Sequence, residues 1–193
     1  MPQFQLGTPP FTTDGAFEPV DADVPMLQGQ LTVPVRIALP KQAMPATGWP
    51  LYQFFHGSGG TTSSLIDNGY QPAPDIAAQP GTGPAQVVAR HGIASVSMAL
   101  PVNPERLPGA SDTAYINFSN LSAFPYTFEQ GVIEQRLLLD AMLALQIDPA
   151  SLAACTGLSL PKGTSAHFFD AGRVVAGGQS MGGMYTNMIG AVE

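Results

Sequence analysis

The chain has 193 residues, of which 14 are acidic and 7 are basic, so its formal net charge is −7. Nucleic acids and anionic membrane surfaces bind clustered lysine and arginine, so this acidic balance argues against both as partners. Only 11% of the residues are charged and 45% are hydrophobic, which is typical of a folded domain. A single cysteine and three scattered histidines offer no disulfide and no metal-ligand spacing, so we expect neither a metal nor a cofactor.

Nothing in the sequence predicts a membrane span, because no apolar run approaches the roughly 20 residues that a spanning helix needs. The first residues contain no basic stretch followed by an apolar core, so we expect no signal peptide within this sequence. Low lysine content with many prolines and glycines favours an exported protein, extracellular or periplasmic with its signal already removed, over a cytoplasmic one.

The first part of the chain is predicted to form strands that lead into a glycine-rich loop. Residues 1–16 are rich in proline, threonine and glycine and predict an irregular N-terminal arm. Two strand-like runs are expected over 17–39, and Pro34 in the second run favours an edge position in a sheet. A short, dense apolar strand at 51–55 then runs directly into the loop 56–60, His-Gly-Ser-Gly-Gly.

The rest of the chain is predicted to alternate strands and helices. In chain order we expect a loop at 61–82, a short helix at 84–90, a strand at 93–100, a loop at 101–126, a helix at 127–145, a polar insert at 148–170, a strand at 173–177 and a helix at 181–192. The long helix is placed by a capping-box pattern, with Thr127 as N-cap and Gln130 three residues later. This alternation predicts an α/β fold with a mainly parallel sheet and flanking helices.

The strongest functional signal is a G-x-S-x-G pattern between the last predicted strand and the last predicted helix. A serine at the apex of a sharp strand-to-helix turn has a strained backbone and an exposed hydroxyl. Gly178 and Gly182 are expected beside Ser180 because a Cβ atom at either place would collide with the neighbouring strand or helix. The turn also places Ser180 and Met181 at a helix N-terminus, which favours a developing negative charge.

The glycine-rich loop after the strand 51–55 is the second signal. Glycines allow backbone N–H groups to approach a substrate oxygen closely, and a tetrahedral intermediate needs two or more such donors. We expect Ser58 or Gly59 to supply one N–H group of this oxyanion hole and Met181 the other. Loops that leave the carboxyl ends of parallel strands share one edge of the sheet, so this loop and Ser180 should meet there.

These features together resemble the α/β-hydrolase family, with serine esterases and lipases as the nearest kind. The resemblance is carried by the segments 54–60, 97–101 and 169–183 and spans about residues 20–192. It implies that residues 17–193 form the N-terminal portion of one α/β-hydrolase domain that lacks its C-terminal strands and helices. It also implies that Ser180 is the nucleophile, with Gln179 in place of the histidine often found before it.

In this family the acid and the base of the triad follow the nucleophile, in the order Ser, then Asp or Glu, then His. The residues after Ser180 contain no histidine. We therefore expect a C-terminal segment or a second polypeptide to supply the Asp and the His. The last strand would then be an uncovered apolar sheet edge, which folded proteins avoid.

Two other sets of residues have open interpretations. His56 is expected to order the oxyanion loop through hydrogen bonds, because the base of this family comes after the nucleophile. The candidates for lining a substrate pocket are His56, Tyr115, Phe118, Phe124 and Tyr126. The four aromatic residues could instead anchor the long loop to the body of the protein.

The sequence thus predicts a carboxylic ester hydrolase that acts on a small-molecule ester through an acyl-enzyme at Ser180. One alternative is a non-catalytic binding or scaffold module that retains the fold. Another is an acyltransferase or peptidase on the same fold, since the serine turn is common to all of them. The aromatic loop favours an apolar or aromatic ester, and the acidic surface argues against a polyanionic substrate.

Overall fold

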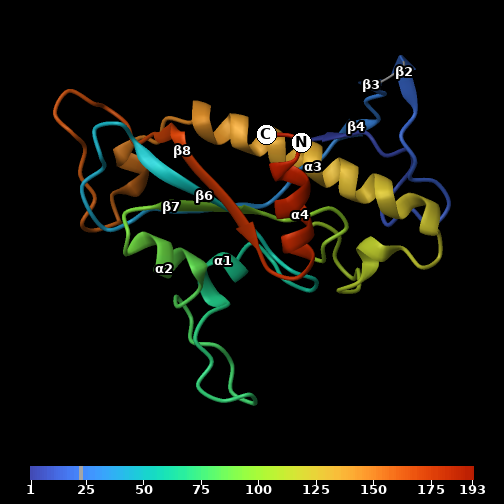
Figure 1. The fold of residues 1–193 in the computed structure, drawn as a ribbon, viewed down its shortest axis with the longest axis horizontal. Helices are drawn as coiled ribbons and strands as arrows, with labels where there is room; N and C mark the ends of the chain where they lie inside the picture. Colours follow the sequence, from blue (N-terminus) through green and yellow to red (C-terminus); the bar gives the residue numbers. More distant parts are fainter. Residues whose placement is uncertain (22–23) are drawn as a thin grey trace.

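The computed structural model describes residues 1–21 and 24–193 (Figure 1). Its strands are β1 (Pro2–Gln3), β2 (Pro19–Asp21), β3 (Val24–Pro25), β4 (Gly29–Gln30), β5 (Val35–Ala38), β6 (Trp49–Phe55), β7 (Ala94–Met98) and β8 (Phe169–Gly178). Its α-helices are α1 (Ser64–Asp67), α2 (Pro84–Ala89), α3 (Phe124–Ala144) and α4 (Met181–Gly190). Short 3₁₀ turns are η1 (Ala114–Ile116), η2 (Leu121–Ala123) and η3 (Pro149–Leu152).

A four-stranded sheet in the order β5-β7-β6-β8 forms the centre of the molecule. β6 pairs in parallel with both β7 and β8, whereas β5 pairs antiparallel with β7. The sheet is therefore mixed, with three parallel strands and one antiparallel strand at an edge. Because β6, β7 and β8 point the same way, the loops that leave their carboxyl ends meet at one edge of the sheet.

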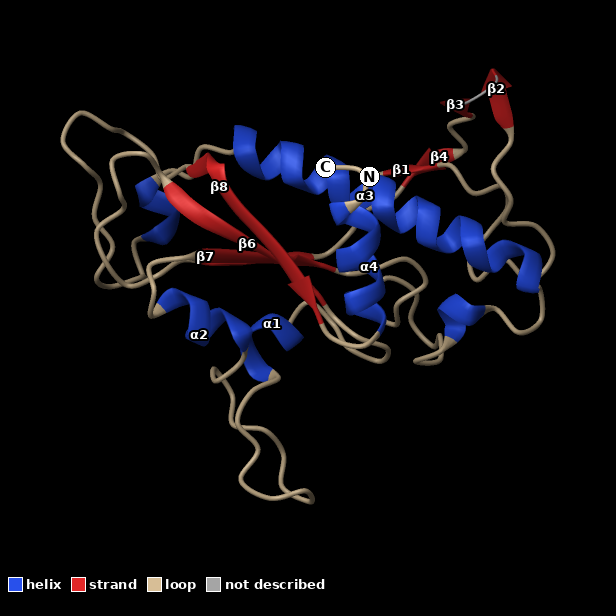
Figure 2. Cartoon of the chain, in the orientation of Figure 1, coloured by secondary structure: helices blue, strands red, loops and turns tan. Residues whose placement is uncertain are grey.

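The alternation of side chains along β6 assigns the helices to the two faces of the sheet. Leu51 packs in one buried cluster with residues of α3, and Phe55 packs in a second cluster with residues of α3 and α4. Phe54, which points the opposite way, packs against residues of α1 and α2. Figure 2 shows this arrangement, with α3 on one side of the sheet and α1 and α2 on the other.

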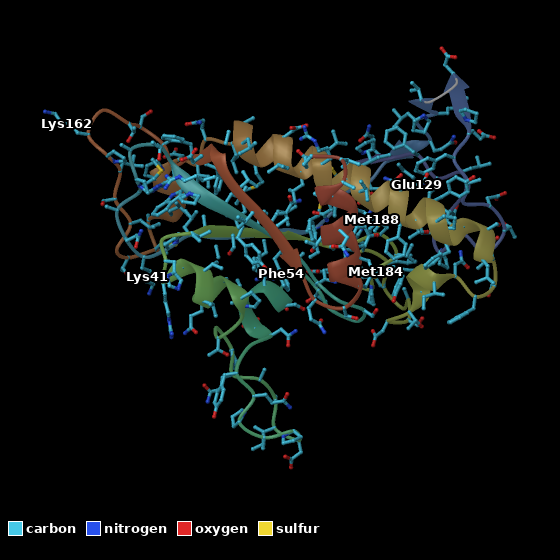
Figure 3. All side chains as sticks on the ribbon, viewed as in Figure 1. Lys41, Phe54, Glu129, Lys162, Met184 and Met188 are labelled. Atoms are coloured by element: carbon cyan, nitrogen blue, oxygen red, sulfur yellow. The ribbon has the colours of Figure 1, made fainter. Side chains whose placement is uncertain are left out.

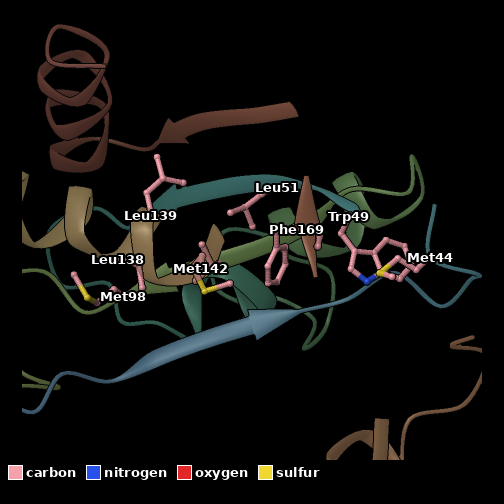
Figure 4. Close-up of a cluster of buried hydrophobic side chains, with 10 residues drawn as sticks. Met44, Trp49, Leu51, Met98, Leu138, Leu139, Met142 and Phe169 are labelled. Carbon is pink, nitrogen blue, oxygen red and sulfur yellow. The ribbon is translucent and has the colours of Figure 1, made fainter. Parts of the chain in front are cut away.

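The largest part of the core lies between α3 and the sheet (Figure 4). The members labelled in the figure are Met44, Trp49, Leu51, Met98, Leu138, Leu139, Met142 and Phe169. Full burial of one such side chain stabilises a fold by about 1.5–3 kcal/mol, so this cluster holds α3 on the strands. α3 is also 21 residues long, yet no described helix is both long and apolar enough to cross a membrane.

The helix α3 begins at Phe124, three residues before the predicted start, so the predicted capping box is wrong. The Thr127 hydroxyl is inside the helix, where it donates to the carbonyl of Ala123 at 3.1 Å. It also accepts a hydrogen bond from the Gln5 side chain at 3.1 Å. The Gln130 amide group bonds the N-terminal arm, so both residues of the apparent capping box serve tertiary contacts.

Other boundaries also differ from the prediction, and three of the differences have a clear structural meaning. β8 begins at Phe169, inside the predicted polar insert, because Phe169 pairs with Trp49 of β6. The predicted loop 61–82 contains the short helix α1. β5 begins only after Pro34, which has no N–H group for the sheet, and β5 does lie at an edge as that proline predicts.

The N-terminal arm, 1–16, is mostly irregular, as predicted, but it is held firmly on the body. Gln5 is fully buried, and its side chain donates to the Gly15 carbonyl and to Thr127 of α3. The Phe4 backbone N–H group donates to the Gln130 side chain at 2.8 Å. The arm therefore packs as part of the domain, and it covers the N-terminal end of α3.

Candidate active site

Ser180 lies in the two-residue turn, Gln179 and Ser180, between the end of β8 and the first residue of α4. Its backbone has φ 56° and ψ −121°, a conformation that non-glycine residues rarely adopt. Its side chain does not cap α4, and the residue is exposed. The predicted strained serine with an accessible hydroxyl is confirmed.

The two glycines of the turn are required by close backbone contacts. A Cβ atom on Gly178 would lie 2.4 Å from the carbonyl group of Gly182. A Cβ atom on Gly182 would lie 2.0 Å from the carbonyl oxygen of Phe55, at the end of β6. Real Cβ atoms essentially never come within 3.0 Å of such atoms, so the expected reason for both glycines is confirmed.

The glycine-rich loop after β6 touches the serine turn directly. A Cβ atom on Gly57 would lie 2.6 Å from the side-chain oxygen of Gln179 and 3.2 Å from Cβ of Ser180. Gly57 is thus a residue of the site that the sequence did not single out. Beside it lies a cavity of about 380 Å³, lined by residues 57–60, 63, 64, 67, 68 and 179.

The predicted oxyanion donors lie in the two segments that meet at Ser180. No hydrogen bond between described residues uses the backbone N–H groups of Ser58 or Gly59, although the N–H group of Gly60 donates to the Gly57 carbonyl at 3.0 Å. Met181 is the first residue of α4, so its N–H group has no partner within the helix. Unused donors therefore lie in both of the segments that meet at the serine turn, as the predicted oxyanion hole requires.

His56 is fully buried beneath this loop, and both of its ring nitrogens have partners. The Leu100 backbone N–H group lies 3.2 Å from Nε2, which must accept because that group can only donate. Nδ1 then carries the proton and donates to the Gly57 carbonyl at 2.9 Å. His56 is placed to order the loop and has no free nitrogen for a general base. Its predicted place in a substrate pocket is wrong, because the side chain is not accessible.

Burial makes the stability of the protein depend on pH through two histidines. It lowers the pKa of His56, and also that of His167, below the usual value of 6.5. The unfolded chain then binds more protons, so the free energy of unfolding should be highest above pH 6.5 and fall as the pH falls towards the folded-state pKa values. Urea unfolding between about pH 7.5 and pH 5.5 measures this slope.

Two variants separate the contributions of the two histidines. His56→Gln and His167→Gln should each reduce the slope of stability against pH, because each removes one buried histidine. A slope that is the same in the wild type and in His56→Gln would contradict the assignment of His56 as a buried neutral group.

Tyr115 is the one predicted aromatic residue that reaches the glycine-rich loop. Its hydroxyl lies 2.7 Å from the hydroxyl of Ser58. Its ring packs edge-on against Phe128 of α3, with ring centroids 5.9 Å apart. Tyr115 thereby links one predicted oxyanion residue to the helix layer.

The other three aromatic residues do not join it in one pocket. Phe118 is 75% exposed. Phe124 packs against Phe128 with ring centroids 5.1 Å apart, and Tyr126 packs against Phe17 at 5.4 Å. Phe124 and Tyr126 lie within α3, so Tyr115 is the only one of the four aromatic residues that anchors the long loop. A pocket built from all four aromatic residues is not formed.

No described histidine is placed to activate Ser180. His91 and His167 precede β7 and β8, at the amino ends of these parallel strands, whereas Ser180 follows the carboxyl end of β8. Asp170 is also at the amino end of β8, where Arg173 holds its pKa below the usual range. The histidine expected as the base of a triad is thus not found near Ser180 among residues 1–21 and 24–193.

Two surfaces beside the serine turn are uncovered within the described part of the chain. β8 is an edge strand with an outer side that no described strand pairs with, and Val175 on it is 54% exposed. Between α3 and α4 lies an apolar groove of about 740 Å³, with Met184 and Met188 on α4 and Glu129 on α3 (Figure 3). Apolar surface of this extent is typical of a place where another element packs.

Comparison of the chain with protein-family models, with curated proteins and with solved structures found no match. Among the described residues, no group of three or more His, Cys, Asp and Glu side chains could hold a metal ion.

Proposed function

We propose that this chain carries the nucleophile and the oxyanion hole of a serine hydrolase that cleaves carboxylic esters, on an α/β-hydrolase fold. The observation that carries the proposal is the backbone of Ser180, held at φ 56° between two glycines that have no room for a side chain. A strained, exposed serine at a helix N-terminus, beside unused backbone donors, is the arrangement that acyl transfer needs.

The reaction would proceed in two steps. The Ser180 hydroxyl attacks the ester carbonyl carbon while a base takes its proton, and the N–H groups of Met181 and of Ser58 or Gly59 stabilise the resulting oxyanion. Collapse of the tetrahedral intermediate expels the alcohol, which takes up that proton, and leaves the acyl group on Ser180. Water then attacks the acyl-enzyme by the same route and releases the carboxylic acid.

We infer that the base and the acid of the triad come from a segment or a polypeptide other than residues 1–193. Two observations support this. The three histidines are either fully bonded, as His56 is, or lie at the opposite edge of the sheet. The uncovered edge of β8 and the apolar groove beside α4 offer a surface for such a segment.

Covalent labelling with a fluorophosphonate tests the proposal. The protein isolated with any polypeptide that accompanies it should react at Ser180, and Ser180→Ala should abolish the reaction. Ser151→Ala, an exposed serine in η3, serves as the matched control and should keep full labelling. Labelling that survives Ser180→Ala would disprove the assignment of the nucleophile.

The 193-residue chain alone should react very slowly or not at all, because it lacks a placed base. Intact mass spectrometry of the active sample should reveal a partner polypeptide or a longer chain that contains an Asp and a His. Full esterase activity of the pure 193-residue chain would show instead that one of its own histidines is the base.

A non-catalytic binding or scaffold module is the second candidate function. The observation that favours it is the lack of a placed base among the described residues. Under this alternative, Ser180 would not react with a fluorophosphonate in any preparation, so the same experiment distinguishes the two.

A further inference from the structure

A carboxylate from the loop after β7 accepts hydrogen bonds from the residues that follow the glycine-rich loop. The side chain of Glu105 accepts a hydrogen bond from the Thr62 backbone N–H group at 2.7 Å and another from the Thr62 hydroxyl at 2.8 Å. Both carboxylate oxygens are thus used on one residue. Thr62 is only 1% exposed, so its two donors have no ready replacement in solvent.

Asn103, two residues earlier, completes the connection. Its side-chain NH₂ group donates to the Gly60 carbonyl at 2.6 Å, and its side-chain oxygen accepts from the Glu105 backbone N–H group at 2.9 Å. Asn103 is itself buried. Three hydrogen bonds therefore join the Asn103–Glu105 turn to the segment that ends the glycine-rich loop, and a fourth holds the turn itself together.

The glycine-rich loop needs hydrogen bonds from other elements because its glycines allow the backbone many conformations. Gly57, Gly59 and Gly60 have no side chains to restrict it, and Gly59 adopts φ +70°. The loop is fixed at its start by His56, which bonds the Gly57 carbonyl. The bonds from Asn103 and Glu105 tie its far end to the loop after β7, in addition to local bonds such as that from the Thr61 N–H group to the Ser64 hydroxyl at 3.1 Å. The Ser58 contact with Tyr115 lies between the two ends.

We propose that Glu105, assisted by Asn103, is a positioning residue that holds the N–H groups of Ser58 and Gly59 in place for the oxyanion. This inference rests on the proposed function, because the donors matter only if Ser180 reacts. A misplacement of about 1 Å in a catalytic group can lower a rate by about a hundredfold. A loop that drifts by that amount would lose the oxyanion stabilisation while substrate binding elsewhere is retained.

Glu105→Gln is the informative variant because its two effects on the reaction rate at Ser180 are opposite: the loss of a negative charge should raise the rate, and the loss of loop alignment should lower it. The amide keeps one acceptor oxygen but turns an NH₂ group towards the second Thr62 donor, so one of the two hydrogen bonds between residues 105 and 62 is lost. Loss of a negative charge near the site would, by itself, favour an oxyanion. A fall in rate would therefore report the loss of alignment.

The first measurement is fluorophosphonate inactivation of the complete assembly, with the rate constant of the covalent step separated from the inhibitor constant. In Glu105→Gln the covalent rate should fall by about tenfold to a hundredfold, with the inhibitor constant unchanged. Thr62→Val, which keeps the backbone donor but loses the hydroxyl, should show a smaller fall in the same step. Asp140→Asn, a carboxylate-to-amide change on the exposed side of α3, is the matched control and should match the wild type.

The second measurement is amide hydrogen exchange of the 193-residue chain over residues 57–62. Glu105→Gln should speed exchange in this segment and leave α3 and β6 protected. Unchanged exchange and an unchanged covalent rate would overturn the proposal. So would faster exchange throughout the protein with a lower melting temperature, because Glu105 would then be a general structural residue.

The two measurements separate this inference from the proposed function. If the wild-type assembly fails to react at Ser180, the proposed function fails. Hydrogen exchange still decides whether Glu105 holds the loop, since it needs no activity. If Ser180 reacts normally in both the wild type and Glu105→Gln, the positioning role of Glu105 is rejected and the proposed function stands.

Discussion

Gly182→Ala should destabilise the protein by at least about 3 kcal/mol, or prevent folding, because overpacking here cannot relax. The new Cβ atom would lie 2.0 Å from the Phe55 carbonyl oxygen and 2.7 Å from its carbon. These are backbone atoms of β6, the strand that the sheet holds on both sides, so no flexible side chain can move aside. Chemical unfolding monitored by circular dichroism measures the loss.

Gly183→Ala, one residue further along the same helix, is the matched control. Its Cβ atom would meet nothing closer than the Gly178 carbonyl oxygen at 3.9 Å. Alanine also favours a helix over glycine by about 0.5–1 kcal/mol, so this variant should be as stable as the wild type or slightly more stable. Equal stability of the two variants would contradict the close approach of α4 to β6.

Arg106→Met should cost about 3–5 kcal/mol, because it leaves a buried carboxylate without its cation. Arg106 and Glu134 form a two-pronged ion pair, with distances of 2.5 and 3.0 Å, and the side chains are only 8% and 0% exposed. Gln130 donates to the same carboxylate at 2.8 Å, so Glu134 also organises the groups that hold the N-terminal arm. Urea unfolding at neutral pH measures the cost.

Two comparisons make this prediction specific. The double variant Arg106→Met/Glu134→Met should recover part of the lost stability, since no unpaired charge remains buried. Arg136→Met removes an exposed arginine that pairs with Asp140 and Glu193, and it should leave the unfolding midpoint essentially unchanged. A double variant less stable than Arg106→Met alone would contradict the explanation by buried charge.

The serine turn could be predicted from the sequence because its determinants are local. The strand, the glycines and the helix that surround Ser180 are consecutive in the chain, and each of them restricts the same few backbone angles. The role of His56 followed instead from the resemblance to the α/β-hydrolase family, in which the base comes after the nucleophile. The side-by-side position of the two loops needed only the rule that parallel strands end at one edge.

The parts that could not be predicted depend on contacts between distant residues. Thr127 and Gln130 match a capping box in sequence, but Gln5 and Phe4 from the far end of the chain use their side chains instead. Glu105 reaches Thr62 across 43 positions, and no local pattern marks it.

The contact between the N-terminal arm and α3 has a consequence for how the chain is made. The Phe4 backbone bonds Gln130, 126 positions later, and Gln5 is buried only once Thr127 is in place. During synthesis the Phe4 N–H group and the Gln5 side chain can therefore reach these partners only after residue 130 has left the ribosome. The arm thus docks after α3 has been made, although it comes far earlier in the chain.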